Sequence, residues 1–154
     1  MFEVVVGRGD AAEAQTPQAI VLYDDDCGFC RWTLGLLLMW DRRRRLWPAP
    51  IVGAVGDRWL AGMPVDERLA SWHLVEAGGR VSSAGAGLAE VLSYVSGGGL
   101  FAPLLQRAPT LIERGYRFVA DHRSGFSRFV PGWAVRRATA RVERRAGGSP
   151  PAWA

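Results

Sequence analysis

The chain contains no lysine, because all 19 of its basic residues are arginine. This absence excludes mechanisms that need a side-chain amine, such as a lysine Schiff base or the phosphate-binding lysine of a P-loop. Long apolar runs are absent as well: the longest, Leu34–Trp40, is far shorter than the roughly 18 residues of a membrane-spanning helix. No N-terminal stretch has the pattern of a signal peptide, so we expect a cytoplasmic protein.

Cysteine and histidine are scarce. The only cysteines, Cys27 and Cys30, form a Cys-x-x-Cys pair, and the only histidines, His73 and His122, lie far apart in the sequence. In a reducing compartment such a cysteine pair is more often catalytic or metal-binding than structural. A disulfide between them closes too short a loop to constrain the unfolded chain much. We interpret each histidine as an ordinary packed or exposed residue.

Length and charge indicate one domain with an uneven surface. With 154 residues, 49% of them hydrophobic, the chain can bury a core without cross-links. Residues 1–106 carry a net charge of −3 and residues 107–154 a net charge of +7. Such a basic half is usually a solvated helix surface, although it can also attract anionic partners. We divide the chain into a leader at 1–18, a domain with a helical extension at 19–130, and a basic helix and tail at 131–154.

The pattern of apolar and turn-forming residues predicts alternating strands and helices. A buried strand, Ala19–Tyr23, precedes the loop Asp24–Asp26 and a helix from about Cys27 to Trp40, with Asp26 as its N-cap. The other expected segments are strands at 46–52, 72–75 and 80–83, helices at 57–62, 86–95, 100–105, 110–121 and 133–146, and a frayed end at 147–154. Two prolines in the second strand are typical of a sheet edge. This order predicts a thioredoxin-like α/β core, β-α-β followed by a β-hairpin and a helix, with an α-helical C-terminal extension.

Two cysteines three residues apart at a helix start lie on one face of a single turn. Free backbone N–H groups and the helix dipole favour a thiolate at the first of them, which lowers its pKa and makes it nucleophilic. Cys27 would therefore attack a disulfide, and Cys30 would resolve the mixed disulfide. The neighbouring carboxylates oppose the thiolate, and the sequence leaves the sign of the net effect open. A partly buried Asp24 or Asp26 could instead relay a proton to or from the pair.

The stretch YDDDCGFC resembles the signature of the DCC thiol-disulfide oxidoreductase family, which is Tyr-Asp-Gly-Asp-Cys-x-x-Cys after an apolar strand. The matching positions are Tyr23, Asp24, Asp26, Cys27 and Cys30, whereas Asp25 replaces a glycine. Two later segments, SSAGAGLAEVL and GYRFVADHR, are also similar to family segments, with His122 in place of an asparagine. The resemblance spans about residues 19–130. It implies a thioredoxin-like fold and disulfide exchange, with natural substrates generally undefined.

The resemblance to thioredoxin itself is weaker. Asp26 replaces the tryptophan that precedes the first cysteine there, and no proline directly precedes the strand at 72–75, where thioredoxins place a substrate-contacting cis-proline. Pro64 is the nearest. Peptide docking in the thioredoxin manner is therefore not an expectation for this chain.

We predict a thiol-disulfide oxidoreductase whose site comprises Cys27, Cys30, Asp24 and Asp26, with the aspartates shaping the helix start and the proton path. No cofactor, metal or nucleic acid is expected. The partners would be a thiol or disulfide substrate and an external reductant. The principal alternative is a non-enzymatic module that binds an anionic partner or a membrane surface through its arginine-rich C-terminal half. The arginines of its last helix are Arg136, Arg137, Arg141, Arg144 and Arg145.

Three other readings remain open on sequence alone. Asp24-x-Asp26 after a strand fits the nucleophile motif of haloacid dehalogenase-like phosphatases, but no later acidic pair suited to Mg²⁺ follows, since Asp66-Glu67 is expected in a loop. The two thiols could bind zinc, but a closed site needs four ligands. They could also be a plain buried pair. The seven tryptophans form no spaced nucleic-acid platform, and we expect most of them to pack around the core.

Overall fold

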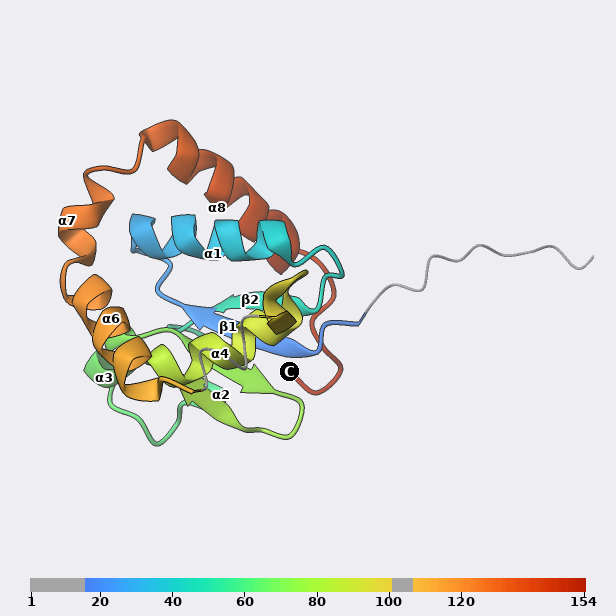
Figure 1. Cartoon of the computed structure of the whole chain (residues 1–154). Helices are drawn as coiled ribbons and strands as arrows, with labels where there is room; N and C mark the ends of the chain where they lie inside the picture. The colour runs from blue at the N-terminus through green and yellow to red at the C-terminus, as the bar shows by residue number, and fades with distance from the viewer. Residues whose placement is uncertain (1–15, 101–106) are drawn as a thin grey trace, which may run out of the picture.

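The computed structural model describes residues 16–100 and 107–154, and it has the predicted mixed α/β architecture (Figure 1). Its four-stranded sheet has the order β2-β1-β3-β4. The strands are β1 (Ala19–Tyr23), β2 (Leu46–Pro50), β3 (His73–Glu76) and β4 (Val81–Ser83). β1 pairs with β2 in parallel and with β3 antiparallel, and β3 pairs antiparallel with β4. This is a thioredoxin-like sheet followed by a helical C-terminal part, as the order of elements predicted.

The helices agree with the sequence in most places. They are α1 (Gly28–Trp40), α2 (Ala54–Trp59), α3 (Val65–Ala70), α4 (Ala84–Tyr94), the short 3₁₀ helix η1 (Gly98–Leu100), α6 (Pro109–Asp121), α7 (Arg123–Ser127) and α8 (Gly132–Ala146). The helix expected at 57–62 lies three residues earlier, and α7 was not predicted. The expected loop at Asp66-Glu67 is wrong, because both residues lie in the first turn of α3, where the dipole favours acidic side chains. All but the first residue of the helix expected at 100–105 lies outside the described residues.

β1 forms the centre of the core. All five of its residues are buried, and they alternate between two apolar clusters on opposite faces of the sheet. Val21 contributes to the cluster under α1 and α4, whereas Ile20 and Leu22 contribute to the cluster on the other face. β2 lies at the sheet edge, as Pro48 and Pro50 indicated, because proline has no N–H to donate to a second neighbour.

Helix α1 lies between α8 and the sheet (Figure 1). Gly35 allows α8 to approach closely, since a Cβ at this position would lie only 2.5 Å from the Cβ of Ala138. Val142 of α8 reaches the same core cluster as β1. The basic helix α8 is thus packed against the dithiol-bearing helix along its length. The last residues of α1, Met39 and Trp40, are exposed, so the helix is apolar beyond the part that the core encloses.

A buried ion pair fixes the end of α1. Asp41 is 1% exposed, and its carboxylate accepts hydrogen bonds from the backbone N–H groups of Arg45 and Leu46, both at 3.0 Å. The guanidinium of Arg145 donates to the same carboxylate at 2.6 Å and to the carbonyl oxygen of Leu46 at 3.2 Å. Arg145, one of the arginines of the basic C-terminal half, therefore links α8 to the loop between α1 and β2.

The tail after α8 is packed, so the expectation of a frayed end is wrong. Pro151 is buried, and the ring of Trp153 meets the ring of Trp59 edge-on with centroids 5.7 Å apart. A side-chain nitrogen of Arg58 donates to the carbonyl oxygen of Ala154 at 2.6 Å. The tail thus packs against the apolar cluster that contains Ile20 and Leu22, on the face of the sheet opposite α1. Within residues 16–100 and 107–154, no helix combines the length and apolar character that a membrane span requires.

Candidate active site

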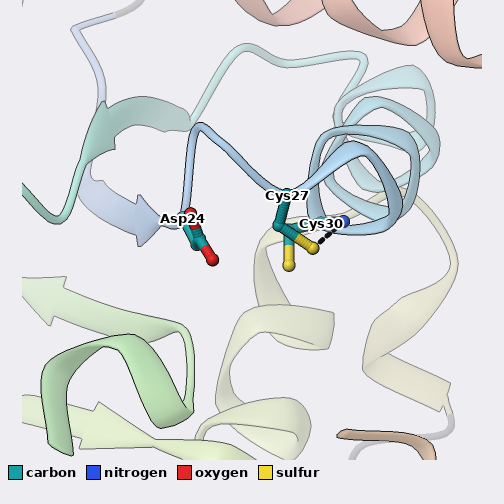
Figure 2. Close-up of side chains that lie close together, drawn as sticks. All are labelled: Asp24, Cys27 and Cys30. Carbon is teal, nitrogen blue, oxygen red and sulfur yellow. Dashed lines mark hydrogen bonds between the residues drawn. The ribbon is translucent and has the colours of Figure 1, made fainter. Parts of the chain in front are cut away.

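Cys27 caps the helix that carries the dithiol. Its backbone is extended, with φ −84° and ψ 108°, and its sulfur accepts the N–H of Cys30 at 3.2 Å (Figure 2). The prediction of Asp26 as the N-cap is therefore wrong. Asp26 is exposed, and its own N–H donates to the carboxylate of Asp24 at 3.1 Å, which folds the loop so that the next residue reaches the free helix N–H groups.

The two thiols and one carboxylate lie together where β1 meets α1. Cys27 and Cys30 are free thiols and both are half-buried. A carboxylate oxygen of half-buried Asp24 and the two sulfur atoms all lie within 4.8 Å of one another (Figure 2). The short loop after β1 and the first turn of α1 thus bring three of the four predicted site residues into one cluster. Asp26 contributes its backbone to the loop, while its side chain points to solvent.

The pKa of the Cys27 thiol is lowered to about 6. The largest cause is the hydrogen bond that the Cys30 thiol donates to the Cys27 sulfur, and the backbone N–H of Cys30 acts in the same direction. Burial and the charge of Asp24 oppose the shift, and the charge of Arg123 supports it. The hydrogen-bond donors to the Cys27 sulfur therefore lower its pKa by more than the Asp24 carboxylate raises it. The sequence alone left the direction of this net shift open.

The second thiol is shifted in the opposite direction. The pKa of Cys30 is raised, because its proton is held in the hydrogen bond to Cys27 and because burial and the neighbouring negative charges disfavour a second anion. Near neutral pH the pair thus consists of one thiolate at the helix terminus and one protonated thiol beneath it. Such an asymmetry distinguishes an attacking cysteine from a resolving one.

Removing the charge of Asp24 should make the thiolate easier to form. In Asp24→Asn the pKa of Cys27 is expected to fall further, because the carboxylate raises it, whereas in Arg123→Gln it is expected to rise. Asp26→Asn is the matched control, because the Asp26 side chain is exposed and does not contribute to the Cys27 shift. The pH dependence of thiolate absorbance in the ultraviolet measures all three. Equal midpoints in Asp24→Asn and Asp26→Asn would contradict this electrostatic assignment.

The acidic loop offers donors for a cation without completing a closed site. The carboxylates of Asp24, Asp25 and Asp26 also lie within 4.8 Å of one another. Neither histidine joins these groups among the described residues. His73 is buried, with Nδ1 2.6 Å from the Ser83 hydroxyl and Nε2 2.9 Å from the carbonyl oxygen of Arg68, and burial lowers its pKa. Among the described residues, the two thiols and Asp24 therefore supply three donors, one fewer than the four protein ligands of a closed zinc site.

Asp25, which replaces the glycine of the family signature, has an ordinary backbone conformation. Among the described non-glycine residues, positive φ occurs only at Arg44 and Ala84, so Asp25 does not adopt the conformation that a glycine there would make easy. Ala84, with φ 53°, opens α4, and its N–H donates to the hydroxyl of Ser71 at 3.0 Å.

Helix α6 and the first residue of α7 supply groups that sequence reasoning did not assign to the site. The hydroxyl of Tyr116 lies 2.9 Å from that of Ser71, just before β3, and a side-chain nitrogen of Arg123 donates to the carbonyl oxygen of Leu69 at 3.1 Å. These contacts bring the cation of Arg123 close enough to influence both thiols. The segment GYRFVADHR was noticed for its resemblance alone, and the structure gives a physical reason for its tyrosine and its last arginine.

Comparison with known proteins identifies a family. The family model described as DCC1-like thiol-disulfide oxidoreductase matches residues 21–129, well over half of the chain. The matched region begins in β1, contains both cysteines and extends through α6 to the end of α7. No curated protein and no solved structure is similar enough to this chain to count as a match.

Proposed function

The chain belongs to the DCC1-like thiol-disulfide oxidoreductase family, and we propose that it exchanges thiols and disulfides through Cys27 and Cys30. The observation that supports this most strongly is the asymmetry of the pair. Cys27, at the N-terminus of α1, has a pKa of about 6, while the pKa of Cys30 is raised above that of an ordinary thiol. A nucleophile that is ionised at neutral pH thus lies beside a thiol that is kept protonated until it is needed.

In the proposed reaction the Cys27 thiolate attacks one sulfur of a substrate disulfide. A bond forms between Cys27 and that sulfur, the substrate S–S bond breaks, and the other half leaves as a thiolate that takes up a proton. Cys30 then loses its proton and attacks the Cys27 sulfur, which releases the second half. Two electrons pass from the dithiol to the substrate, and an external thiol reductant restores the pair. The partners and the cytoplasmic location remain predictions.

We propose that Asp24 assists the second step. Its carboxylate lies within 4.8 Å of both sulfurs, and Cys30 must lose its proton before it can attack. We assign the receipt of that proton to Asp24, while Asp26 shapes the loop through its N–H. No bound cofactor takes part in this scheme.

The stabilised thiolate also bears on the redox potential. A lowered pKa at the attacking cysteine stabilises the reduced form, so the pair should be a stronger oxidant than an unperturbed dithiol. A titration in glutathione redox buffers, followed by mass after alkylation of free thiols, measures the midpoint. We expect an intramolecular disulfide between Cys27 and Cys30 and a more reducing midpoint in Arg123→Gln. A pair that forms no internal disulfide in any buffer would contradict the proposal.

The alternative, an arginine-rich binding module, makes the opposite prediction. Two arginines of α8 have internal partners: Arg145 bonds Asp41, and Arg141 donates to the carbonyl oxygen of Gly35 at 3.1 Å. The exposed arginines of this helix are Arg136, Arg137 and Arg144. Changing these three to glutamine should leave the disulfide exchange rate unchanged, whereas a binding module would lose its activity in cells. Cys27→Ser and Cys30→Ser should abolish disulfide exchange, whereas they should leave the activity of a binding module in cells unchanged.

A further inference from the structure

A largely apolar cavity of about 500 Å³ lies beside the dithiol. Cys30 and Asp24 form part of its wall, and the other polar side chains that line it are few. Most of the lining is aliphatic or aromatic and comes from β1, α1, α4 and α6. A cavity of this size and character is typical of a binding site for a small organic molecule. An occupant of the cavity would therefore lie beside Cys30, the resolving cysteine of the proposed reaction.

The cavity follows one face of α1 away from the dithiol. Cys30, Leu34 and Leu37 line it, and their spacing of four and seven residues places them on the same side of the helix. With a rise of 1.5 Å per residue, Cys30 and Leu37 are about 10 Å apart along the axis. Given carbon–carbon bonds of about 1.5 Å, an extended alkyl chain of roughly eight carbons spans this distance. The dithiol lies at one end of that path, and Val91 of α4 contributes to the aliphatic lining.

Helix α6 is bonded in place over the cavity. Its Tyr116 hydroxyl meets Ser71 at 2.9 Å, and the carboxylate of its Glu113 accepts the N–H of Gly85, at the start of α4, at 3.1 Å. Arg123, immediately after α6, donates to the carbonyl oxygen of Leu69 at 3.1 Å. Three polar contacts, two to the C-terminal end of α3 and one to α4, therefore hold this wall at a fixed position.

At Gly115 the wall of the cavity carries no side chain. This residue lies in the middle of α6 and lines the cavity, yet no atom lies within 4 Å of the position that its Cβ would occupy. A glycine inside a helix costs about 1 kcal/mol relative to alanine, and here no close helix packing requires it. By contrast, Gly35 in α1 is in close contact with α8. Gly115 is exposed, so a larger side chain can be introduced at this lining position without a clash.

We propose that this cavity binds the apolar chain of a small disulfide, with the sulfur that Cys27 attacks at its dithiol end. This inference rests on the proposed function and names its substrate class. Cys27 forms a bond to the sulfur that carries the chain, the substrate S–S bond breaks, and the other half leaves as a thiolate. Cys30 then attacks Cys27 from the cavity wall, and the chain leaves as an alkyl thiol. The dithiol loses two electrons, which the substrate gains.

Mixed disulfides of thionitrobenzoate with ethyl, butyl, hexyl and octyl thiols test the proposal. The coloured leaving group is the same in all four, and each rate is divided by the rate of free dithiothreitol with the same probe. We expect kcat/KM to rise with chain length, by up to about fourfold for each methylene that is fully buried. Gly115→Phe adds a ring at a residue that lines the cavity and should flatten this rise, with the rate of the octyl probe falling most. Gly115→Ala is the matched control and should retain most of the rise.

The outcomes separate the two proposals. Release of thionitrobenzoate at a rate independent of chain length, in the wild-type protein, overturns the substrate class and leaves disulfide exchange intact. No release from any probe overturns the exchange itself. A glutathione disulfide rate that equals the octyl rate also contradicts an apolar substrate. The wild-type series decides the matter even if Gly115→Phe fails to fold, and thermal unfolding of the variant identifies that case.

Discussion

Cys30→Ser should accumulate a covalent adduct between Cys27 and any disulfide that the protein attacks. The serine hydroxyl cannot displace the bound half, so the reaction stops after its first step. With a small disulfide probe we expect close to one equivalent of adduct, which dithiothreitol removes. Intact-protein mass spectrometry measures it, and peptide mapping locates it. The pKa of Cys27 should rise in Cys30→Ala, because alanine has no donor to replace the hydrogen bond from the Cys30 thiol, which is the largest cause of the lowering.

Cys27→Ser should lose turnover by on the order of a thousandfold or more, because the change removes the nucleophile itself. The Cys30 thiol that remains has a raised pKa and is a poor replacement. Both variants should fold as the wild type does, since the two sulfurs are free and form no cross-link in this structure. An adduct that forms on Cys30 in Cys27→Ser as fast as on Cys27 in Cys30→Ser would reverse the assigned roles.

Breaking the ion pair between Asp41 and Arg145 should destabilise the fold by about 3–5 kcal/mol, the range found when a buried charge loses its partner. The Asp41 side chain is 0% exposed and that of Arg145 is 14% exposed, so solvent screens the pair little. Asp41→Asn or Arg145→Met leaves the other charge uncompensated between α1, β2 and α8. Urea denaturation followed by tryptophan fluorescence measures the loss.

A double variant and an exposed pair serve as controls. The combination of Asp41→Asn with Arg145→Met should recover part of the loss, because no buried charge is then left alone. Recovery stays incomplete, since the Asp41 carboxylate also accepts the N–H groups of Arg45 and Leu46. Arg80→Gln removes an exposed cation that pairs with Glu76 and Glu90, and it should change stability little because solvent screens the Arg80 charge. A similar loss of unfolding free energy in Arg80→Gln and in Arg145→Met would contradict the claim that burial makes the Asp41–Arg145 pair more important for stability.

Local sequence signals predicted the part of the fold that carries the dithiol. The continuous apolar run Ala19–Tyr23, the polar loop and the apolar helix that follows are all encoded within about twenty residues, and their order suffices for a β-α-β unit. Prolines in β2 identified the sheet edge for a similarly local reason. The errors lie where long-range contacts decide. The tail at 147–154 is rich in glycine, alanine and proline, and long-range contacts order it: Pro151 is buried, and Trp153 meets Trp59 across the chain.

The candidate site was predictable to the same extent. Spacing alone placed Cys27 and Cys30 at a helix start. The sequence could not give the sign of the pKa shift, because that depends on where the Cys30 thiol and N–H point relative to the carboxylate of Asp24. Nor could it assign Tyr116 and Arg123, which reach the site only because α6 docks across α4. The segment that contains them resembles a family segment, but only the packing of α6 shows which groups Tyr116 and Arg123 contact.

The pH dependence of iodoacetamide alkylation, mapped to individual cysteines in the reduced protein, tests the central claim most directly. Alkylation requires the thiolate, so its rate falls about tenfold for each pH unit below the pKa. We predict that Cys27 reacts with a midpoint near its pKa of about 6 and that its rate is level through neutral pH, while Cys30 stays unmodified in the folded protein. A midpoint for Cys27 near that of an ordinary thiol, or faster modification of Cys30, would contradict the account.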